Sequence, residues 1–304
     1  MITWVVGGNG LLGSAIRQHS GDSFSSATIP WPTPEAAAAT LSDEVTRFRA
    51  ESAGEPWAIV WAAGAATVST PRDRAFAELE SLRALLTAVR QTPPAGPGMV
   101  FLTSSAGGVY AGSANPPFDA TTPPVPVSAY GELKLAQEQL AAALLAGSCP
   151  VAIGRVSNLY GAGQNLDKLQ GLISHLALAA ATSHPVNIFV SLDTIRDYVY
   201  VDDAARAVRS IVDAHVGRDA GLVTTSVIAS GEPTTVGQLI RTVRQVTKRR
   251  IPVASGYHSS AASQVADLRL TPSDPSIART PLPAGVRAVY LDILSRLQRK
   301  PLTA

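Results

Sequence analysis

The sequence is poor in cysteine and in charged residues. Its single cysteine, Cys149, excludes an internal disulfide and fits a reducing compartment. Charged residues make up 16% of the 304 residues, below the roughly 25% of an average soluble chain. The 25 Lys and Arg are nearly balanced by 23 Asp and Glu, which leaves a net charge of +2. Nucleic-acid binders usually carry a basic stripe, so we expect no nucleic-acid partner.

Long apolar runs and metal-binding patterns are also missing. No run reaches the roughly 18 apolar residues that cross a bilayer, and the first residues lack the basic segment of a secretion signal. The five histidines show no spacing typical of a metal site. We therefore expect a cytoplasmic protein with no membrane partner and no metal. Apolar residues make up 46% of the chain, so a large core can form and disorder is excluded.

Short apolar runs alternate with stretches of helical periodicity in the first half of the chain. Strands are expected at 2–6, 24–29, 57–61, 99–102 and 151–153, and helices at 11–19, 74–90 and 130–146. Strands that are apolar on both faces and separated by helices indicate a parallel sheet covered on both sides. The pattern predicts a Rossmann-type, doubly wound α/β fold.

The regular alternation weakens after residue 160. Strands are still expected at 198–201 and 222–228 and a helix at 236–248, whereas 253–285 is rich in loops. We therefore predict a smaller C-terminal lobe. Residues 1–163 would form the dinucleotide-binding domain, joined by returning segments near 194–230. Residues 164–193 and 231–304 would form the substrate-binding lobe.

A glycine-rich turn follows the first expected strand and reads Gly7-x-x-Gly10-x-x-Gly13. Glycines allow positive φ angles and close approach of a phosphate to the backbone. The helix that follows directs free N–H groups and its positive end at an anion. An ordinary tight turn is the alternative interpretation, but the position on the first strand–helix unit favours a dinucleotide cofactor.

An acidic residue usually ends the second strand of a dinucleotide site and binds the adenosine ribose. The expected strand at 24–29 has no acid, and Asp22 precedes it. The Ser26 hydroxyl could instead donate to a 2′-phosphate. This favours NADP slightly over NAD, although no arginine lies beside the strand end.

Tyr130 and Lys134 are spaced i, i+4 at the start of an expected helix, so both side chains lie on one face. Ser128 is a plausible N-cap, which places Tyr130 near the positive helix end. A neighbouring ammonium favours the phenolate, so the phenol could act as a general acid or base near neutral pH. A chance pair on an exposed helix is the alternative.

Small hydroxyl residues, Ser104 and Ser105, end the strand expected at 99–102 and lead into a glycine loop. Side chains at the carboxyl ends of parallel strands face the ligand crevice. A serine there could hydrogen-bond a substrate oxygen. A strand-end turn with locally satisfied hydroxyls is the alternative.

Taken together, these features resemble the extended short-chain dehydrogenases/reductases of the NAD-dependent epimerase/dehydratase type, which act on nucleotide sugars. The resemblance covers nearly the whole chain. The matching pieces are Gly7-x-x-Gly10-x-x-Gly13, Ala62-Ala63-Gly64, Ser104-Ser105 with Val109-Tyr110, Tyr130-x-x-x-Lys134, Arg155-Val156-Ser157-Asn158-Leu159-Tyr160-Gly161 and Arg196-Asp197-Tyr198-Val199-Tyr200-Val201-Asp202-Asp203.

The resemblance implies roles for individual residues. Tyr130 would be the acid/base and Lys134 its ribose-binding partner, while Asn158 would lie near the substrate phosphates. Arg196 would contact the substrate diphosphate, or alternatively form a salt bridge to Asp197 or Asp202. The residues expected at the cofactor are Gly7, Gly10, Leu11, Leu12, Gly13, Ser26, Ala62, Ala63, Gly64, Tyr130 and Lys134.

Two departures from the family pattern affect the expected chemistry. The position that commonly holds the catalytic hydroxyl is Ala106, so Ser105 becomes the expected catalytic and substrate-binding serine, with Ser104 as the alternative. Ala106-Gly107-Gly108 also replaces the Asp-Glu pair of the family's sugar dehydratases, which disfavours a dehydratase.

The resemblance implies an NAD- or NADP-dependent enzyme that epimerises a nucleotide sugar through a transient keto sugar. An NADPH-dependent reductase of a nucleotide keto sugar is the first alternative, because an acid is missing from the second strand. A non-catalytic NAD(P)-binding sensor is the second alternative. Relatives often dimerise through the helices expected at 74–90 and 130–146, so a homodimer is expected.

Overall fold

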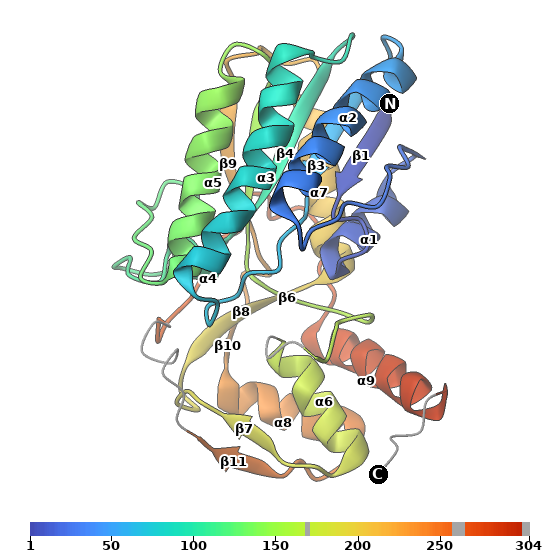
Figure 1. Ribbon diagram of the computed structural model, residues 1–304. Helices are drawn as coiled ribbons and strands as arrows, with labels where there is room; N and C mark the ends of the chain where they lie inside the picture. Colours follow the sequence, from blue (N-terminus) through green and yellow to red (C-terminus); the bar gives the residue numbers. More distant parts are fainter. Residues whose placement is uncertain (168–170, 257–264, 300–304) are drawn as a thin grey trace.

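The computed structural model describes residues 1–167, 171–256 and 265–299. Its main feature is a six-stranded sheet of parallel strands in the order β2-β1-β3-β4-β5-β9 (Figure 1). These strands are β1 (Ile2–Val6), β2 (Asp22–Ser23), β3 (Trp57–Trp61), β4 (Gly98–Ser105), β5 (Val151–Val156) and β9 (Val223–Ile228). The predicted Rossmann-type α/β fold is confirmed.

Helices cover both faces of this sheet. One layer consists of α1 (Leu11–His19) and α7 (Val201–His215), and the other of α2 (Pro34–Ser52), α3 (Arg72–Gln91) and α5 (Ala129–Leu145). A short helix, α4 (Ala106–Val109), directly follows β4. Because apolar side chains meet the sheet from both sides, all five residues of β3 are buried.

The expected second strand at 24–29 is wrong, because β2 ends at Ser23. The ring of Phe24 packs edge-on against Trp4 and Phe48 in an aromatic cluster beneath α2. The backbone N–H of Ala27 donates to the carboxylate of Glu44 on α2 at 3.0 Å. Phe24 still donates its N–H to the carbonyl of Thr3 on β1 at 2.9 Å, whereas Ala27 is bonded to α2, so the pairing with β1 stops after Phe24.

A second lobe lies at the lower end of Figure 1 and has its own apolar core. It contains α6 (Leu172–Thr182), α8 (Val236–Thr247), α9 (Leu282–Arg299) and the pair β7 (Val186–Ile188) and β11 (Val253–Ser255). Between this lobe and the main sheet lies a three-stranded sheet of β10 (Pro233–Thr235), β8 (Ile195–Tyr200) and β6 (Asn158–Tyr160) (Figure 1). The predicted domain boundaries stay a prediction.

Two differences from the expected elements bear on function. Strand β4 extends to Ser105 rather than ending at Leu102, which places both serines in regular strand geometry. Strand β8 begins at Ile195, so Arg196 also lies within a strand. The stretch expected to be rich in loops, 253–285, contains β11 and the start of α9, and its residues 257–264 lie outside the described ones.

The aromatic cluster predicts a large effect of truncation. Phe48 is fully buried and contacts the rings of Trp4, Phe24 and Trp57. We expect Phe48→Ala to lower the free energy of unfolding by about 3–5 kcal/mol, measured by urea denaturation. The control Leu291→Ala removes a side chain that is 54% exposed and should change it by less than about 0.5 kcal/mol. Equal losses in the two variants would contradict this account.

Candidate active site

The glycine turn lies where the strand order reverses, between β1 and β3. Ligands of open parallel sheets bind beyond the carboxyl ends of the strands at such a point. Gly7 has a φ of +87°, and a Cβ on it would lie only 2.6 Å from the backbone nitrogen of Ala63. A Cβ on Gly13 would overlap the carbonyl oxygen of Gly7. Glycines at both positions therefore let the ends of β1, β3 and α1 come together.

The first turn of α1 fits an anionic group. Gly10 is the N-cap and provides no side-chain cap, and its own N–H donates to the carbonyl of Gly7 at 2.9 Å. The first amides of a helix have no partner within it, so those of Leu11, Leu12 and Gly13 are oriented to donate to a ligand. This arrangement fits the diphosphate of a dinucleotide.

Tyr130 and Lys134 lie on the first turns of α5. The Ser128 hydroxyl caps this helix by accepting a hydrogen bond from the N–H of Gly131 at 3.1 Å. Nζ of Lys134 lies 5.8 Å from the centre of the Tyr130 ring and donates to Oε1 of Gln137 at 3.0 Å. Only 7% of Lys134 is exposed, so the ammonium lies close to the phenol in a poorly hydrated place.

The surroundings change the proton affinity of both groups. Burial raises the pKa of the Tyr130 phenol, a hydrogen bond with Ser105 lowers it, and the charge of Glu78 raises it. Burial lowers the pKa of Lys134, which the charges of Glu78 and Glu138 oppose. Two carboxylates thus favour the ammonium, and one of them disfavours the phenolate.

The two adjacent serines at the end of β4 face different partners, because successive strand residues point to opposite sides. The Ser104 hydroxyl donates to Oε1 of Glu138 and is buried. The Ser105 hydroxyl accepts from the N–H of Gly108 at 3.2 Å and hydrogen-bonds with Tyr130. Ser105 is therefore the serine beside the phenol.

A buried ion pair fixes α5 against the sheet. The guanidinium of Arg155 on β5 binds the Glu138 carboxylate through two nitrogens, the shortest distance being 2.7 Å. Its third nitrogen donates to the Tyr110 hydroxyl at 2.8 Å, which in turn donates to the carbonyl of Asp119 at 2.6 Å. Since Ser104 binds the same carboxylate, β4, β5 and α5 are joined next to the tyrosine–lysine pair.

The loop after β3 connects the glycine turn with α5. A Cβ on Gly64 would lie 3.7 Å from Nζ of Lys134 and 3.3 Å from Oε2 of Glu78. Glu78 on α3 was not among the residues expected from the sequence. The available signal was its spacing from Ala75 and Leu82, at i−3 and i+4, which places an acid on the buried face of the helix.

The two residues expected at the substrate phosphates, Asn158 and Arg196, lie on the three-stranded sheet. Asn158 begins β6, and its amide Nδ2 donates to the carbonyl of Asp197 at 2.9 Å. Arg196 is 9% exposed, and its Nη1 donates to the carbonyls of Ile195 and Val265. Burial lowers the pKa of Arg196, opposed by Tyr198 and Asp267.

The acids near Arg196 are engaged with other groups. Asp197 accepts hydrogen bonds from Ser230 and from the N–H of Gly231, while Asp202 pairs with His19 at 3.9 Å. These contacts do not support the alternative in which Arg196 forms a salt bridge with either aspartate.

Ser26, expected at the adenosine ribose, lies in the half-buried loop after β2. An acid does contact this loop, because the carboxylate of Glu44 on α2 accepts a hydrogen bond from the N–H of Ala27, the residue after Ser26. Its two oxygens also accept from Nη1 of Arg47 at 2.7 and 2.8 Å. Glu44 of α2, rather than a residue at the end of the second strand, is thus the acid that contacts this loop, and it is paired with Arg47.

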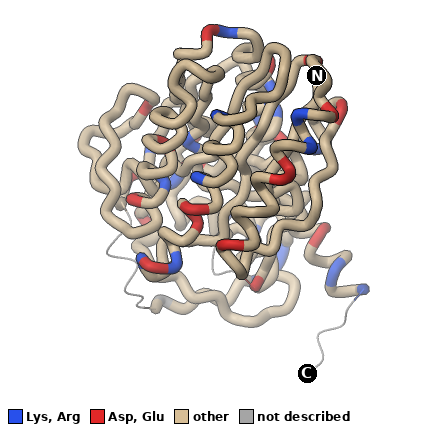
Figure 2. Tube along the Cα trace, turned by 45° about the horizontal axis from the view of Figure 1, so that its top comes forward, with Lys and Arg blue, Asp and Glu red and all other residues tan. Residues whose placement is uncertain are grey.

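Lys and Arg positions alternate with Asp and Glu positions along the described trace, and neither sign gathers in one region of the view in Figure 2. Within the described residues, no helix is both long and apolar enough to span a membrane, and no cluster of three or more His, Cys, Asp or Glu could hold a metal ion.

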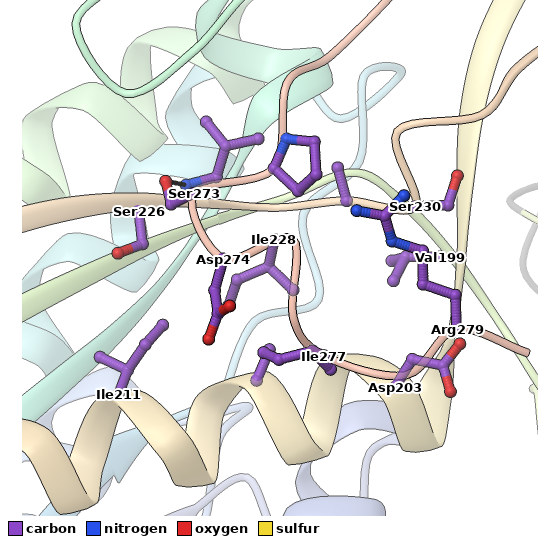
Figure 3. Close-up of a pocket in the computed structure, with 14 residues that line it drawn as sticks. Val199, Asp203, Ile211, Ser226, Ile228, Ser230, Ser273, Asp274, Ile277 and Arg279 are labelled. Carbon is purple, nitrogen blue, oxygen red and sulfur yellow. Dashed lines mark hydrogen bonds between the residues drawn. The ribbon is translucent and has the colours of Figure 1, made fainter.

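A separate crevice of about 130 Å³ lies beside α7 and the end of β9 (Figure 3). Ser226 and Arg279 line it, together with the carboxylates of Asp203 and Asp274. Both carboxylates accept hydrogen bonds from neighbouring loop residues. The tyrosine, the lysine and the glycine turn are not among its lining residues, so we place the candidate site elsewhere, at the carboxyl ends of β1, β3 and β4.

Comparisons with known proteins add to this geometry. Over 124 residues, 40% of the chain, it is 32% identical to a dTDP-L-rhamnose 4-epimerase of Burkholderia thailandensis. Over 176 residues, 56% of the chain, it is 27% identical to a dTDP-4-dehydro-6-deoxyglucose reductase of Escherichia coli. The matches span 33% and 53% of those relatives' own lengths.

The fold resembles a solved structure of UDP-glucose 4-epimerase from Thermotoga maritima with UDP-glucose. The TM-score is 0.78 at 21% identity, and the match covers 98% of this chain and all of the other. A model described as the NAD dependent epimerase/dehydratase family matches residues 3–222. The resemblance noted in the sequence and the expected nicotinamide cofactor are thereby confirmed, and the chain belongs to the NAD dependent epimerase/dehydratase family.

Proposed function

We propose that the protein oxidises and reduces a hydroxyl-bearing carbon of a nucleotide sugar, with NAD or NADP as cofactor. The observation that carries this proposal is the cluster of Ser105, Tyr130 and Lys134 next to the loop that touches the glycine turn. Two hydroxyls and one ammonium at the carboxyl ends of neighbouring strands suit proton transfer beside a bound dinucleotide.

The chain's own residues would handle the proton. As the phenolate, Tyr130 would take the proton of the substrate hydroxyl during oxidation, and as the phenol it would give a proton to the carbonyl oxygen during reduction. The Ser105 hydroxyl would hydrogen-bond the same oxygen, and Lys134 would stabilise the phenolate that oxidation requires and would hold the nicotinamide ribose. Hydride acceptance and return is the chemistry that the bound nicotinamide supplies.

The substrate class is supported by the relatives, whose names refer to dTDP and UDP sugars. Asn158 follows β5 and Arg196 lies on β8, in the sheet between the main sheet and the second lobe. We propose that both face the substrate phosphates, and that the second lobe covers the sugar nucleotide. A guanidinium suits this task because it forms paired hydrogen bonds with phosphate oxygens.

Epimerisation through a transient keto sugar is our first candidate, because it uses the same tyrosine in both half-reactions. Reduction of a keto sugar is the second candidate, favoured by two observations. The pKa of Tyr130 is raised, which suits a proton donor, and Glu44 is paired with Arg47 rather than free for a ribose. Water elimination is not proposed, because Ala106, Gly107 and Gly108 bring no acid to the site.

Incubation of the purified protein with dTDP and UDP sugars, and with their 4-keto forms, distinguishes these candidates. An epimerase interconverts two sugars with no net change in nicotinamide absorbance. A reductase consumes one NADPH for each keto sugar. Binding of cofactor without either reaction would support a sensor.

We also propose a homodimer formed by α3 and α5 of two copies. The half-buried Leu140 and Leu144 are spaced i, i+4 on α5 and pack against the core cluster that also contains α3 residues, and α5 lies beside α3. Sedimentation equilibrium of the purified protein tests this arrangement, since charged substitutions on this face would yield monomers.

Gly13→Ala tests the cofactor turn. The added methyl group would overlap the Gly7 carbonyl and push α1 away from β1, so we expect cofactor affinity to fall by more than about tenfold. Isothermal titration with NAD and NADP measures the loss. Gly21→Ala is the control, because no atom lies within 4 Å of its added methyl group. Unchanged affinity in a folded Gly13→Ala protein would rule out this site.

Tyr130→Phe tests the proton-transfer role. Loss of the hydroxyl should lower kcat by about 10²- to 10⁴-fold, while cofactor affinity stays within a few-fold. Tyr290→Phe, a tyrosine on α9, is the control and should retain full activity. If Tyr130→Phe keeps most of the rate, another group moves the proton.

The raised pKa of Tyr130 predicts opposite pH profiles for the two directions. Reduction requires the protonated phenol, so kcat should be level through neutral pH and fall only in the alkaline range. Oxidation requires the phenolate, so its rate should rise with pH over that same range. Steady-state rates from about pH 6 to 10 check both signs. A reductive rate that falls near pH 6.5, in the range of histidine, would contradict the assignment.

A further inference from the structure

Glu78 extends from α3 toward the loop that follows β3. Its Oε1 accepts hydrogen bonds from the backbone N–H groups of Ala65 and Ala66, both at 2.7 Å. One carboxylate oxygen therefore anchors two successive amides directly after Gly64. This contact holds the loop in place between the glycine turn and α5.

The second oxygen of Glu78 has a different environment. Oε2 is buried and makes no hydrogen bond within the described part of the chain. A Cβ on Gly64 would lie 3.3 Å from this oxygen and 3.7 Å from Nζ of Lys134. A carboxylate from α3 and an ammonium from α5 therefore approach the same glycine from two helices.

Other charged groups near the pair already have partners. Glu138, one turn beyond Lys134, is bound by Arg155 of β5 and by Ser104 of β4. Glu132 on α5 pairs with Arg72 on α3. Oε2 of Glu78 is a buried oxygen with no hydrogen bond and no ion pair among the described residues, and it lies across Gly64 from Nζ of Lys134.

We propose that Glu78 is a positioning residue for the tyrosine–lysine pair, which keeps Lys134 cationic and holds Tyr130 in its protonated form. The carboxylate also anchors the loop at Gly64, so one side chain sets both the shape and the charge of this part of the site. The inference depends on the proposed function, because only a proton-transferring Tyr130 gives this charge a chemical consequence.

The direction of the electrostatic effect agrees with this geometry. The charge of Glu78 raises the pKa of Tyr130 and that of Lys134. The Tyr130 phenol therefore keeps its proton and can donate it, as reduction of a carbonyl requires. A neutral side chain at position 78 would remove the negative charge that disfavours the phenolate of Tyr130, while Glu138 would still support the ammonium of Lys134.

Glu78→Gln separates the charge from the loop contact. The amide oxygen can still accept from Ala65 and Ala66, while the negative charge is lost. Ionisation of Tyr130 is followed by the near-ultraviolet absorbance of phenolate during a pH titration of the NAD-saturated protein, with Tyr130→Phe subtracted in the matching background. We expect the midpoint in Glu78→Gln to lie lower by about one pH unit.

The matched control is Glu80→Gln, two residues along the same helix. Glu80 is exposed and pairs with Arg83 at 3.5 Å, so its loss should leave the titration unchanged. Circular dichroism at each pH confirms that the proteins are folded. If Glu78→Gln does not fold, Glu78→Asp serves as a second variant. Its shorter side chain keeps the charge but withdraws it, so a smaller shift in the same direction is expected.

Equal fractions of phenolate in wild type and the folded Glu78 variant at every pH overturn the inference, as does an equal shift in Glu80→Gln. The titration reads the Tyr130 proton without substrate turnover. Full activity of Tyr130→Phe would therefore remove the proposed function without touching this result. An unmoved titration beside an inactive Tyr130→Phe would remove only the role of Glu78.

Discussion

The ammonium of Lys134 is buried, and the groups around it offset the free-energy cost of removing a cation from water. A buried cation is costly unless hydrogen bonds and opposite charges surround it. Oε1 of Gln137 accepts a hydrogen bond from the ammonium, while Glu78 and Glu138 supply negative charge from two helices. Because Lys134 and Glu138 are one turn apart on α5, the helix must keep a fixed rotation against the sheet. The tyrosine one turn earlier is oriented by that same rotation.

The pairing of Glu138 with Arg155 shows how this rotation is held. The pair lies within the core next to β4 and β5 and leaves neither ion exposed to solvent. It also binds the Ser104 hydroxyl, which leaves Ser105, on the other side of the strand, to meet the phenol. The Glu138–Arg155 ion pair thus lies on one side of the end of β4, and the Ser105–Tyr130 hydrogen bond lies on the other.

Much of the fold could be predicted from local pattern, and the site only in part. Strands β1 and β3 and helix α1 match their predicted bounds, because apolar runs and glycines signal them directly. The strand expected at 24–29 failed because an aromatic cluster and Glu44 of α2 compete for those residues. The glycine turn and the tyrosine–lysine pair were visible as spacing. The proposed role of Glu78 could not be predicted from spacing. It depends on the contact between α3 and the loop at Ala65 and Ala66, which only the tertiary structure determines.

The three-stranded sheet between the main sheet and the second lobe has a mechanical consequence. Strand β5 continues into β6 after a single residue, and β8 passes directly into α7. The carboxylate of Asp197 on β8 accepts a hydrogen bond from the backbone N–H of Gly231, which lies between β9 and β10. Chain continuity and hydrogen bonds thus join the lobe to the main domain at three places, an arrangement that favours small shear movements over rotation about a single flexible joint. For the proposed nucleotide-sugar substrates, we therefore expect selectivity to depend on the fixed side chains that line the site rather than on closure of the lobe around the ligand.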